Sequence, residues 1–314
     1  MEFYKNLDEI LTKKHITKME LCNSIGLSYN TLLSASRRKS KNLSYGTINK
    51  IANYLGCSTD YLFNGKDENQ LKKVAVITGA SGDIGSAIAL NLAQSGYTHI
   101  ALIYKSNKTN ALNLKSLLEA NCNAEIFKCD LTNEKETEDI VNKIINKFSQ
   151  IDCLVNCAGV SHFQQIQDTT EQDYNKVFNN NIKSTILITK FVSKNMISAK
   201  SGKIVNISSI WGSVGASVES LYSASKGAVN SLTLALAKEL APSGINVNCV
   251  CPGFIKGKMN STLSSSAIKD IINSTPLMRA GLPEDVANLV SFLCSSKSDF
   301  ITGQIITVDG GLTL

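Results

Sequence analysis

Apolar residues recur every three or four positions through residues 1–66, a spacing that predicts short amphipathic helices. Thr17, with Glu20 three residues later, has the pattern of a helix-capping box, and Gly26 marks a turn between two helices. Ser28 can cap the second of these helices. The pattern predicts about five short helices, and therefore a small all-α domain. The apolar positions are Phe3, Leu7, Ile10 or Leu11, Ile48, Ile51, Ala52 and Leu55.

The pattern changes after residues 67–73, a polar stretch without apolar periodicity that we interpret as a linker. Over residues 74–314, short apolar runs alternate with longer helical segments, and most runs are apolar on both faces, as buried parallel strands are. This alternation predicts an α/β fold, a Rossmann domain with a doubly wound parallel sheet. The seven candidate strands are KVAVIT (73–78), HIALIY (99–104), AEIFKCD (124–130), DCLVNCAG (152–159), KIVNISS (203–209), INVNCVCP (245–252) and QIITVDG (304–310).

The bulk composition, 43% hydrophobic and 18% charged residues, is that of an ordinary globular chain. No apolar run reaches the roughly 18 residues of a transmembrane helix. The N-terminal MEFYKNLDEI has acidic residues where a signal peptide has its apolar core, so we expect a cytoplasmic protein without a membrane partner. The nine cysteines form no CxxC pair and the three histidines lie far apart, so we expect reduced thiols and no metal site.

Positive charge is concentrated in the helical segment. Residues 1–66 hold 10 Lys and Arg against 5 Asp and Glu, whereas residues 67–314 hold 22 against 21. This asymmetry predicts an acidic partner for residues 1–66 alone. DNA is the favoured partner; the alternatives are an acidic protein such as acyl carrier protein, or a module retained only for assembly.

A small-residue turn follows the first predicted strand, in TGASGDIGSAIALNLAQSG at residues 78–96. Such a turn lets the backbone approach a pyrophosphate, whose charge then faces the N-terminus of the following helix. The second strand ends in IYKSNK, without the acidic residue that binds the adenosine ribose of NAD. Lys105 and Lys108 stand there instead and can meet a 2′-phosphate, so we expect NADP(H) rather than NAD(H), although lysines after a strand are also ordinary surface residues.

Several further motifs follow in order: Thr78-Gly79 with Gly85, Asp130 in CDLT, NCAG at 156–159, Asn181 in NNNIKS, Ser209 in IVNISS, Tyr222 and Lys226 in YSASK, Pro252-Gly253, and ITGQIITVDGG. By these motifs, residues 71–314 resemble the short-chain dehydrogenase/reductase family, and within it the 3-oxoacyl-[acyl carrier protein] reductases. The resemblance implies a homotetramer that reduces a small-molecule or acyl-thioester carbonyl, the thioester being carried on acyl carrier protein. It also implies coenzyme contacts at Gly79, Ala80, Ser81, Gly82, Ile84, Lys105, Asp130, Leu131, Asn156, Ala158, Gly159, Tyr222, Lys226, Pro252, Gly253 and Ile255.

The expected catalytic residues are Asn181, Ser209, Tyr222 and Lys226. Tyr222 and Lys226 are four residues apart on one predicted helix, so they share a face. We expect the lysine ammonium, together with the positive charge of oxidised nicotinamide, to lower the phenol pKa from its usual value of about 10. Tyr222 then protonates the carbonyl oxygen while Ser209 donates a hydrogen bond to it. The resemblance implies that Lys226 also holds the nicotinamide ribose and that Asn181 anchors a water.

Three positions depart from the family pattern. Asp83 replaces the middle glycine of the turn, with a glycine moved to Gly82, and we expect its carboxylate to cap the following helix. Cys157 replaces the second Asn of the family's NNAG, and Gly257 stands where a threonine commonly meets the nicotinamide amide. These departures allow a coenzyme affinity that differs from that of the family, or a slow turnover.

ITKMELCNSIGLSYNTLLS and LSYGTINKIANYLGCSTDYLFNG resemble the lambda-repressor/Cro-type helix-turn-helix family. The resemblance places a recognition helix from about Ser28 to Ser36. In a tetramer, two such domains can bind two DNA half-sites about 34 Å apart, and simultaneous binding of both raises the avidity. DNA contacts are expected from Tyr29, Asn30, Thr31 and Ser34 to base edges, from Lys18, Arg37, Arg38 and Lys39 to phosphates, and from Ser28 at the helix start.

Two alternatives to a 3-oxoacyl reductase with a DNA-binding domain stay open. SSIWGSVGASVESLYSASKGAVN is also similar to the elongation factor P 5-aminopentanone reductases. The other alternative is a transcription regulator whose reductase fold senses NADP(H) or another ligand. Because the expected catalytic residues are all present, the sequence does not separate enzyme from sensor.

Overall fold

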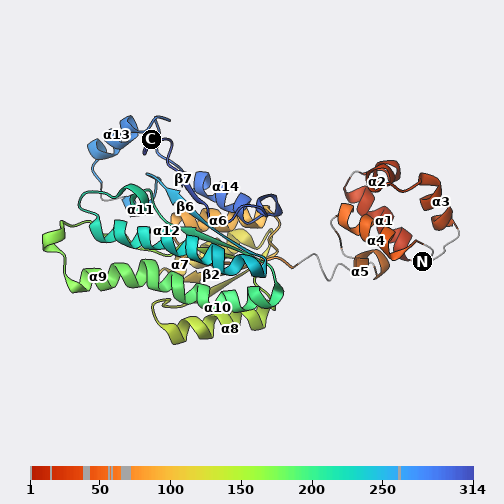
Figure 1. Ribbon diagram of the computed structural model, residues 1–314, viewed down its shortest axis with the longest axis horizontal. Coiled ribbons are helices and arrows are strands. Elements are labelled where there is room, and N and C mark those ends of the chain that lie inside the picture. The colour runs from red at the N-terminus through yellow and green to blue at the C-terminus, as the bar shows by residue number, and fades with distance from the viewer. Residues whose placement is uncertain are drawn as a thin grey trace. The chain divides into compact units, whose positions relative to one another are not determined.

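A computed structural model describes residues 2–14, 16–37, 43–55, 57, 59–64, 72–260 and 263–314. The chain divides into two compact units, Met1–Lys72 and Lys73–Leu314 (Figure 1). Most of the predicted linker, residues 67–71, lies outside the described residues. Each unit is described by itself below.

The described part of the first unit consists of short helices around one apolar core. Leu7, Leu21 and Ile51 are fully buried in it. The predicted capping box is confirmed, since the Glu20 amide donates to Thr17 Oγ1 and the Thr17 amide donates to Glu20 Oε2. The helices are α1 (Glu2–Lys13), α2 (Lys18–Ile25), α3 (Tyr29–Arg37), α4 (Tyr45–Leu55) and α5 (Thr59–Asn64).

The second unit is built on a parallel seven-stranded sheet with the order β3-β2-β1-β4-β5-β6-β7. The strand order reverses between β1 and β4, which is where doubly wound sheets bind their ligands. The predicted fold class is confirmed, and every predicted strand is present. The strands are β1 (Val74–Thr78), β2 (His99–Tyr104), β3 (Asn123–Lys128), β4 (Cys153–Asn156), β5 (Gly202–Ile207), β6 (Ile245–Pro252) and β7 (Ile305–Val308).

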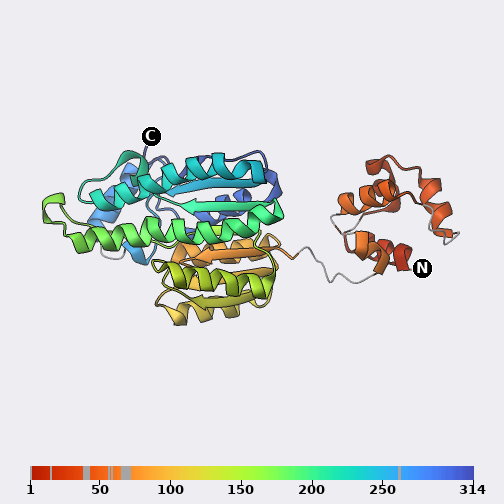
Figure 2. The ribbon, with the colours of Figure 1, turned by 60° about the horizontal axis from the view of Figure 1, so that its bottom comes forward.

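Helices cover both faces of this sheet (Figures 1 and 2). One apolar cluster joins it to α6 (Asp83–Gln94), α7 (Lys108–Leu118) and α14 (Pro283–Leu293). The other joins it to α8 (Glu134–Phe148), α10 (Ser184–Ala199) and α12 (Ser220–Leu240). Shorter elements are α9 (Glu171–Phe178), a π-helical turn (Asn179–Lys183), α11 (Trp211–Val214), α13 (Ser265–Ser274) and 3-10 turns at Ile166–Asp168, Ala241–Ser243, Lys258–Asn260 and Ser296–Ser298.

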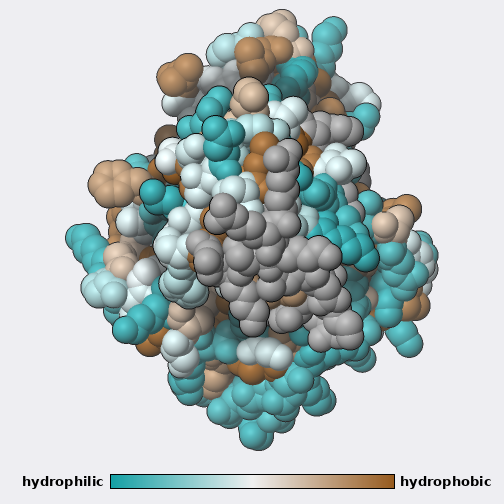
Figure 3. All heavy atoms as spheres, turned by 90° about the vertical axis from the view of Figure 1, so that its right-hand side faces the viewer, coloured by the Kyte–Doolittle hydropathy of each residue, from teal (hydrophilic) through white to brown (hydrophobic). Residues whose placement is uncertain are grey.

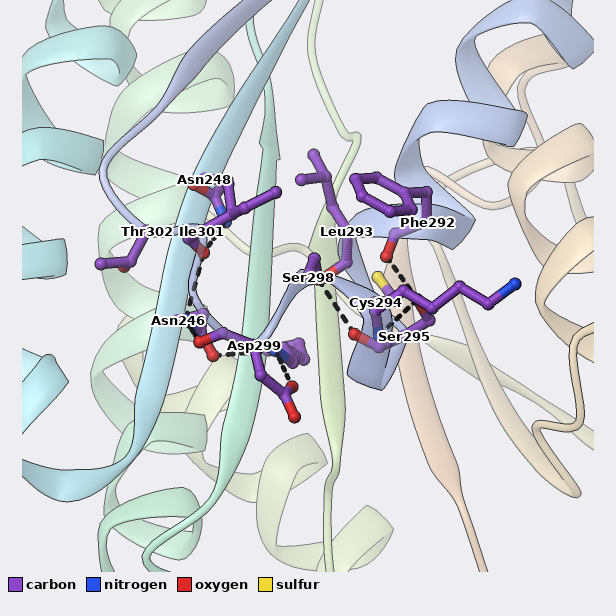
Figure 4. Close-up of polar contacts among 12 residues, drawn as sticks. Asn246, Asn248, Phe292, Leu293, Cys294, Ser295, Ser298, Asp299, Ile301 and Thr302 are labelled. Atoms are coloured by element: carbon purple, nitrogen blue, oxygen red, sulfur yellow. Dashed lines mark hydrogen bonds and ion pairs between the residues drawn. The ribbon is translucent and has the colours of Figure 1, made fainter.

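Polar contacts fasten the edge of the sheet where β5 and β6 begin (Figure 4). The Asn246 side chain donates to the carbonyls of Asp299 and Ile301, and Asn248 donates to Ile301 as well. Lys203 Nζ lies 2.7 Å from the Asp299 carboxylate. This edge is therefore held by the segment after α14, while the strands end at the opposite edge, where the candidate site lies.

Among the described residues, no helix combines the length and the apolar character that crossing a membrane requires.

Candidate active site at the carboxyl edge of the sheet

The turn after β1 is locked to the end of β4. Thr78 Oγ1 accepts the amides of Cys157 and Ala158, each at 3.0 Å. Gly79 has a positive φ of 64°, and a Cβ there would lie 2.8 Å from the Ala158 Cα, so no larger residue fits. Sequence reasoning selected Gly79 and Ala158 as coenzyme contacts but missed the part played by the Thr78 hydroxyl. Its signal is a threonine between a buried strand and a glycine.

The N-terminus of α6 opens from this turn. Gly82 precedes the helix in extended conformation and offers no side-chain cap, so the first amides of α6 can receive an anion. This arrangement fits the pyrophosphate of a dinucleotide. The Asp83 carboxylate does not cap α6, contrary to expectation: its Oδ2 accepts the Lys258 amide at 2.6 Å instead. The predicted contacts Ala80, Ser81 and Ile84 lie in this turn and in the first turn of α6.

Lys105 and Asp130, both predicted coenzyme contacts, form an ion pair with 2.8 Å between Nζ and Oδ2. They follow β2 and β3, so the parallel sheet brings them to the same edge. Burial alone would raise the pKa of Asp130, but hydrogen bonds from Lys105 and Thr132 lower the pKa overall. Lys108 is exposed at the start of α7. The two lysines and the carboxylate thus lie where the adenosine end of a dinucleotide would bind.

Two other predicted coenzyme contacts use their side chains inside the fold. The Asn156 side chain is 3% exposed, and its Nδ2 donates to Thr189 Oγ1 and Asn206 Oδ1. Leu131 packs in the apolar cluster beneath α8. Any contact of these two residues with a coenzyme therefore goes through main-chain atoms, because their side chains are buried.

Tyr222 and Lys226 lie together on α12, as predicted, with exposed fractions of 8% and 5%. Lys226 Nζ donates to the Ile207 carbonyl at 2.9 Å and lies 5.7 Å from the centre of the Tyr222 ring. Burial raises the pKa of Tyr222 to about 12, although a hydrogen bond with Ser209 acts to lower it. Burial also lowers the pKa of Lys226. In the chain by itself the phenol pKa is therefore not lowered, because desolvation outweighs the hydrogen bond with Ser209.

Ser209 and Asn181 complete this group. Ser209 follows β5, and its Oγ accepts the Trp211 amide at 3.2 Å. Asn181 is buried in the π-helical turn, where its Oδ1 accepts the Val160 amide and its Nδ2 donates to the Val160 carbonyl and to Ser225 Oγ. The Asn181 side chain therefore holds the segment after β4, while its main-chain carbonyl accepts a hydrogen bond from Thr185 Oγ1 at 3.0 Å.

The remaining predicted coenzyme positions are Gly159, Pro252, Gly253 and Ile255. A Cβ on Gly159 would lie 3.2 Å from Asn181 Oδ1 and 3.4 Å from Lys226 Nζ, so the main chain passes close to both side chains. Pro252 ends β6, and its carbonyl accepts the Ile210 amide at 3.1 Å. Gly253 and Ile255 follow directly.

Cys157 stands beside these residues at the end of β4. Burial raises the pKa of its thiol to about 11. The thiol is therefore neutral at physiological pH, and it supplies neither the amide donor nor the amide acceptor of the family's asparagine.

The described part of the helical unit presents polar side chains along α3. Tyr29, Asn30, Thr31 and Ser34 are exposed, as base contacts must be. Lys18, a predicted phosphate contact, pairs with Asp8 at 2.7 Å. Hydrophilic and apolar areas are interspersed on the face that Figure 3 shows. Ser28 immediately precedes α3 and Arg37 ends it, whereas Arg38 and Lys39 lie outside the described residues.

In chemical terms, the carboxyl edge of the sheet brings a protonated phenol, a second hydroxyl and a buried lysine to one place, beside a turn that fits a dinucleotide. This is the arrangement of a nicotinamide-dependent oxidoreductase, in which the phenol can protonate an oxygen while hydride is transferred. Among the described residues, no group of three or more His, Cys, Asp or Glu side chains is placed to hold a metal ion.

Comparisons with known proteins agree with this class. Residues 79–313 match the family described as enoyl-(acyl carrier protein) reductase, and residues 6–64 match the Cro/C1-type helix-turn-helix DNA-binding domain. The chain belongs to the short-chain dehydrogenase/reductase family and carries an additional N-terminal helix-turn-helix domain.

Curated relatives match about three quarters of this chain. The chain is 39% identical to the uncharacterized oxidoreductase YmfI of Bacillus subtilis over 243 residues, which is 77% of this chain and 99% of YmfI. It is 37% identical to the 3-oxoacyl-[acyl-carrier-protein] reductase FabG of Thermotoga maritima, covering 77% of this chain and 98% of FabG. A solved short-chain dehydrogenase/reductase from Mycobacterium ulcerans superposes with a TM-score of 0.73 at 29% identity, covering 76% of this chain and 89% of that one.

The buried phenol predicts a particular pH dependence. With Tyr222 as the expected proton donor, reduction needs the protonated phenol, and a pKa of about 12 keeps that form populated through the neutral range. We expect the carbonyl-reduction rate to stay level from roughly pH 6 to 9 and to decline only in more alkaline solution, while oxidation of the alcohol, which needs the phenolate, rises with pH. Initial rates in both directions against pH test this. A reduction rate that falls through pH 7 to 8 would contradict it.

Proposed function

We propose that the chain is an NADP(H)-dependent carbonyl reductase acting on 3-oxoacyl thioesters, with a helix-turn-helix domain that binds DNA. The observation that carries the proposal is the buried group of Tyr222, Lys226 and Ser209 beside the turn after β1. Relatives named 3-oxoacyl-[acyl-carrier-protein] reductase support the substrate class. We also propose a homotetramer in the cytoplasm, in which the thioester is presented on acyl carrier protein.

Different residues of this chain have different roles in carbonyl reduction. The coenzyme, when bound, supplies the hydride that reaches the carbonyl carbon. Tyr222 gives its phenolic proton to the carbonyl oxygen, and Ser209 donates a hydrogen bond to the same oxygen, where negative charge develops. Lys226 holds the nicotinamide ribose, and its positive charge favours the phenolate that remains on Tyr222. Asn181 keeps the segment after β4 against this group through Val160.

The coenzyme preference rests on Lys105 and Lys108, since their positive charge suits the 2′-phosphate of NADP(H). The Asp130 carboxylate, which pairs with Lys105, does not repel the phosphate as strongly as a free carboxylate because the ion pair neutralises it.

We expect Lys105→Ala to weaken NADPH binding about tenfold while leaving NADH binding within about twofold, since only NADPH carries the charge that Lys105 contacts. Titration of protein fluorescence with each coenzyme measures both constants. Lys115→Ala, which removes a lysine paired with Glu125 away from this edge, is the matched control. Equal losses for the two coenzymes in Lys105→Ala would refute the assignment.

A second candidate function is reduction of an amino ketone, as in the elongation factor P 5-aminopentanone reductases. Glu219 lies three residues before Tyr222, and burial raises the pKa of its carboxyl. In the described part of the chain, Glu219 has no ion pair or side-chain hydrogen bond. A half-buried carboxylate so near the phenol favours a substrate that carries an ammonium group.

The substrate class can be tested with the full-length protein and NADPH. We expect oxidation of NADPH with acetoacetyl and longer 3-oxoacyl thioesters, and a loss of about 10²–10⁴ in kcat in Tyr222→Phe with coenzyme binding intact, because the general acid is removed. Free 5-amino-2-pentanone is the competing substrate. Faster turnover of this amino ketone, lost selectively in Glu219→Gln, would favour the second function.

Tight NADPH binding without turnover of either class would contradict both enzymatic functions. It would favour the regulator alternative, in which the reductase fold senses the coenzyme. DNA binding measured with and without NADPH would then show whether the coenzyme changes the affinity.

The DNA-binding proposal rests on the family match of residues 6–64 and on the positive charge of this segment. A selection of genomic fragments by the full chain should recover a motif with two-fold symmetry. We expect Asn30→Ala to relax sequence preference by about 1–3 kcal/mol at one position, and Arg38→Ala to weaken binding to all sequences alike. Recovery of no motif at low salt would contradict a specific operator.

A further inference from the structure

Two of the positions that depart from the family pattern, Asp83 and Gly257, meet in the structure although 174 residues separate them in the sequence. Asp83 is the first residue of α6, at the turn that fits the pyrophosphate. Gly257 lies between the end of β6 and α13. Their meeting joins the coenzyme turn to residues 257–260.

The contact between them is close. Asp83 Oδ2 accepts the main-chain amide of Lys258 at 2.6 Å. A Cβ on Gly257 would lie 2.6 Å from the same oxygen, which is nearer than a side chain can approach. The Lys258 amide therefore reaches the carboxylate because residue 257 has no side chain. A side chain at residue 257 would push the carboxylate away from the Lys258 amide, so the hydrogen bond depends on both departures.

The rest of the segment is held near the same place. The Lys256 amide donates to the Gly281 carbonyl, and the Asn260 side chain donates to the Ile255 carbonyl at 2.7 Å. These bonds tie residues 255–260 to one another and to Gly281. Asp83 alone among these partners belongs to the coenzyme turn.

A carboxylate at the first position of α6 lies in the positive end of the helix dipole, as a bound phosphate would. The carboxylate lies at the place where a pyrophosphate would bring negative charge. A carboxylate and a pyrophosphate at the same helix N-terminus repel each other. Asp83 therefore opposes the coenzyme at the turn where the family has an uncharged glycine.

We propose that Asp83 is a positioning residue, a latch that fastens residues 257–260 to the N-terminus of α6 and competes with the pyrophosphate of the coenzyme. Binding of the coenzyme displaces the carboxylate, and the latch then releases residues 257–260. The latch therefore lowers coenzyme affinity and makes the fastening of residues 257–260 depend on coenzyme. This inference rests on the proposed function only in requiring a dinucleotide at the turn after β1.

Two variants separate the charge of Asp83 from its hydrogen bond. Asp83→Asn keeps an acceptor oxygen and loses the charge, whereas Asp83→Ala loses both. We expect both variants to bind NADPH about three- to tenfold more tightly than the wild type, as removal of a like charge near a helix N-terminus predicts. Affinity for adenosine 2′-phosphate, which has no pyrophosphate, should stay unchanged. Asp270→Asn, on α13, makes the same change in net charge away from the turn and should leave both affinities unchanged.

Amide hydrogen exchange of the protein without coenzyme tests the fastening directly. Exchange at residues 257–260 should be faster in Asp83→Ala and close to wild type in Asp83→Asn. Gly257→Ala should also speed exchange there, because its Cβ forces the carboxylate away. In the wild type, NADPH should speed exchange at the Lys258 amide by breaking its bond to Asp83.

Unchanged or weaker NADPH binding in both Asp83 variants would overturn the competition, and unchanged exchange in Asp83→Ala would overturn the latch. Equal tightening of NADPH and adenosine 2′-phosphate would assign the effect to overall charge and overturn the proposal as well. A wild type that binds neither NADPH nor NADH would refute the proposed coenzyme and the competition with it. The exchange experiment would still decide whether Asp83 fastens the segment.

Discussion

The Thr78 hydroxyl accepts two amides from the end of β4, and the geometry of the site depends on this contact. It holds the ends of β1 and β4 together at the point where the strand order reverses and where the chain leaves the two strands in opposite directions. Gly79 must then pass within contact distance of Ala158, which excludes a side chain. The coenzyme turn and the start of the segment held by Asn181 are both set by this junction.

Burial dominates the electrostatics beside that junction. Tyr222 and Lys226 are taken out of water by α12 and the neighbouring strand ends, so each is pushed toward its neutral form. A neutral phenol suits the reductive direction, in which a proton must be given away. An incoming carbonyl oxygen that gains negative charge is then the group that the Ser209 hydroxyl, the phenol and the lysine can stabilise together.

The helix-turn-helix domain is additional to the reductase fold. The alignment with YmfI spans 99% of that relative and 77% of this chain, so YmfI has no additional segment the size of residues 1–66. The reductase part is nearly neutral, whereas residues 1–66 carry the excess positive charge. On the proposed function, the reductase domain forms the tetramer and changes state when the coenzyme binds. The helical domain directs the protein to a DNA sequence.

The sequence by itself determined the elements and the residue types at the site. Apolar periodicity predicted the helices and strands, because burial repeats every 3.6 residues in a helix and every 2 in a strand. Motif order brought Ser209, Tyr222 and Lys226 into one expected group. Only the tertiary structure decided what each side chain meets: the Lys105–Asp130 ion pair, the core position of Asn156, and the bond from Lys258 to Asp83. The direction of the Tyr222 pKa was also decided there, since desolvation depends on packing around the phenol that no spacing along the chain reveals.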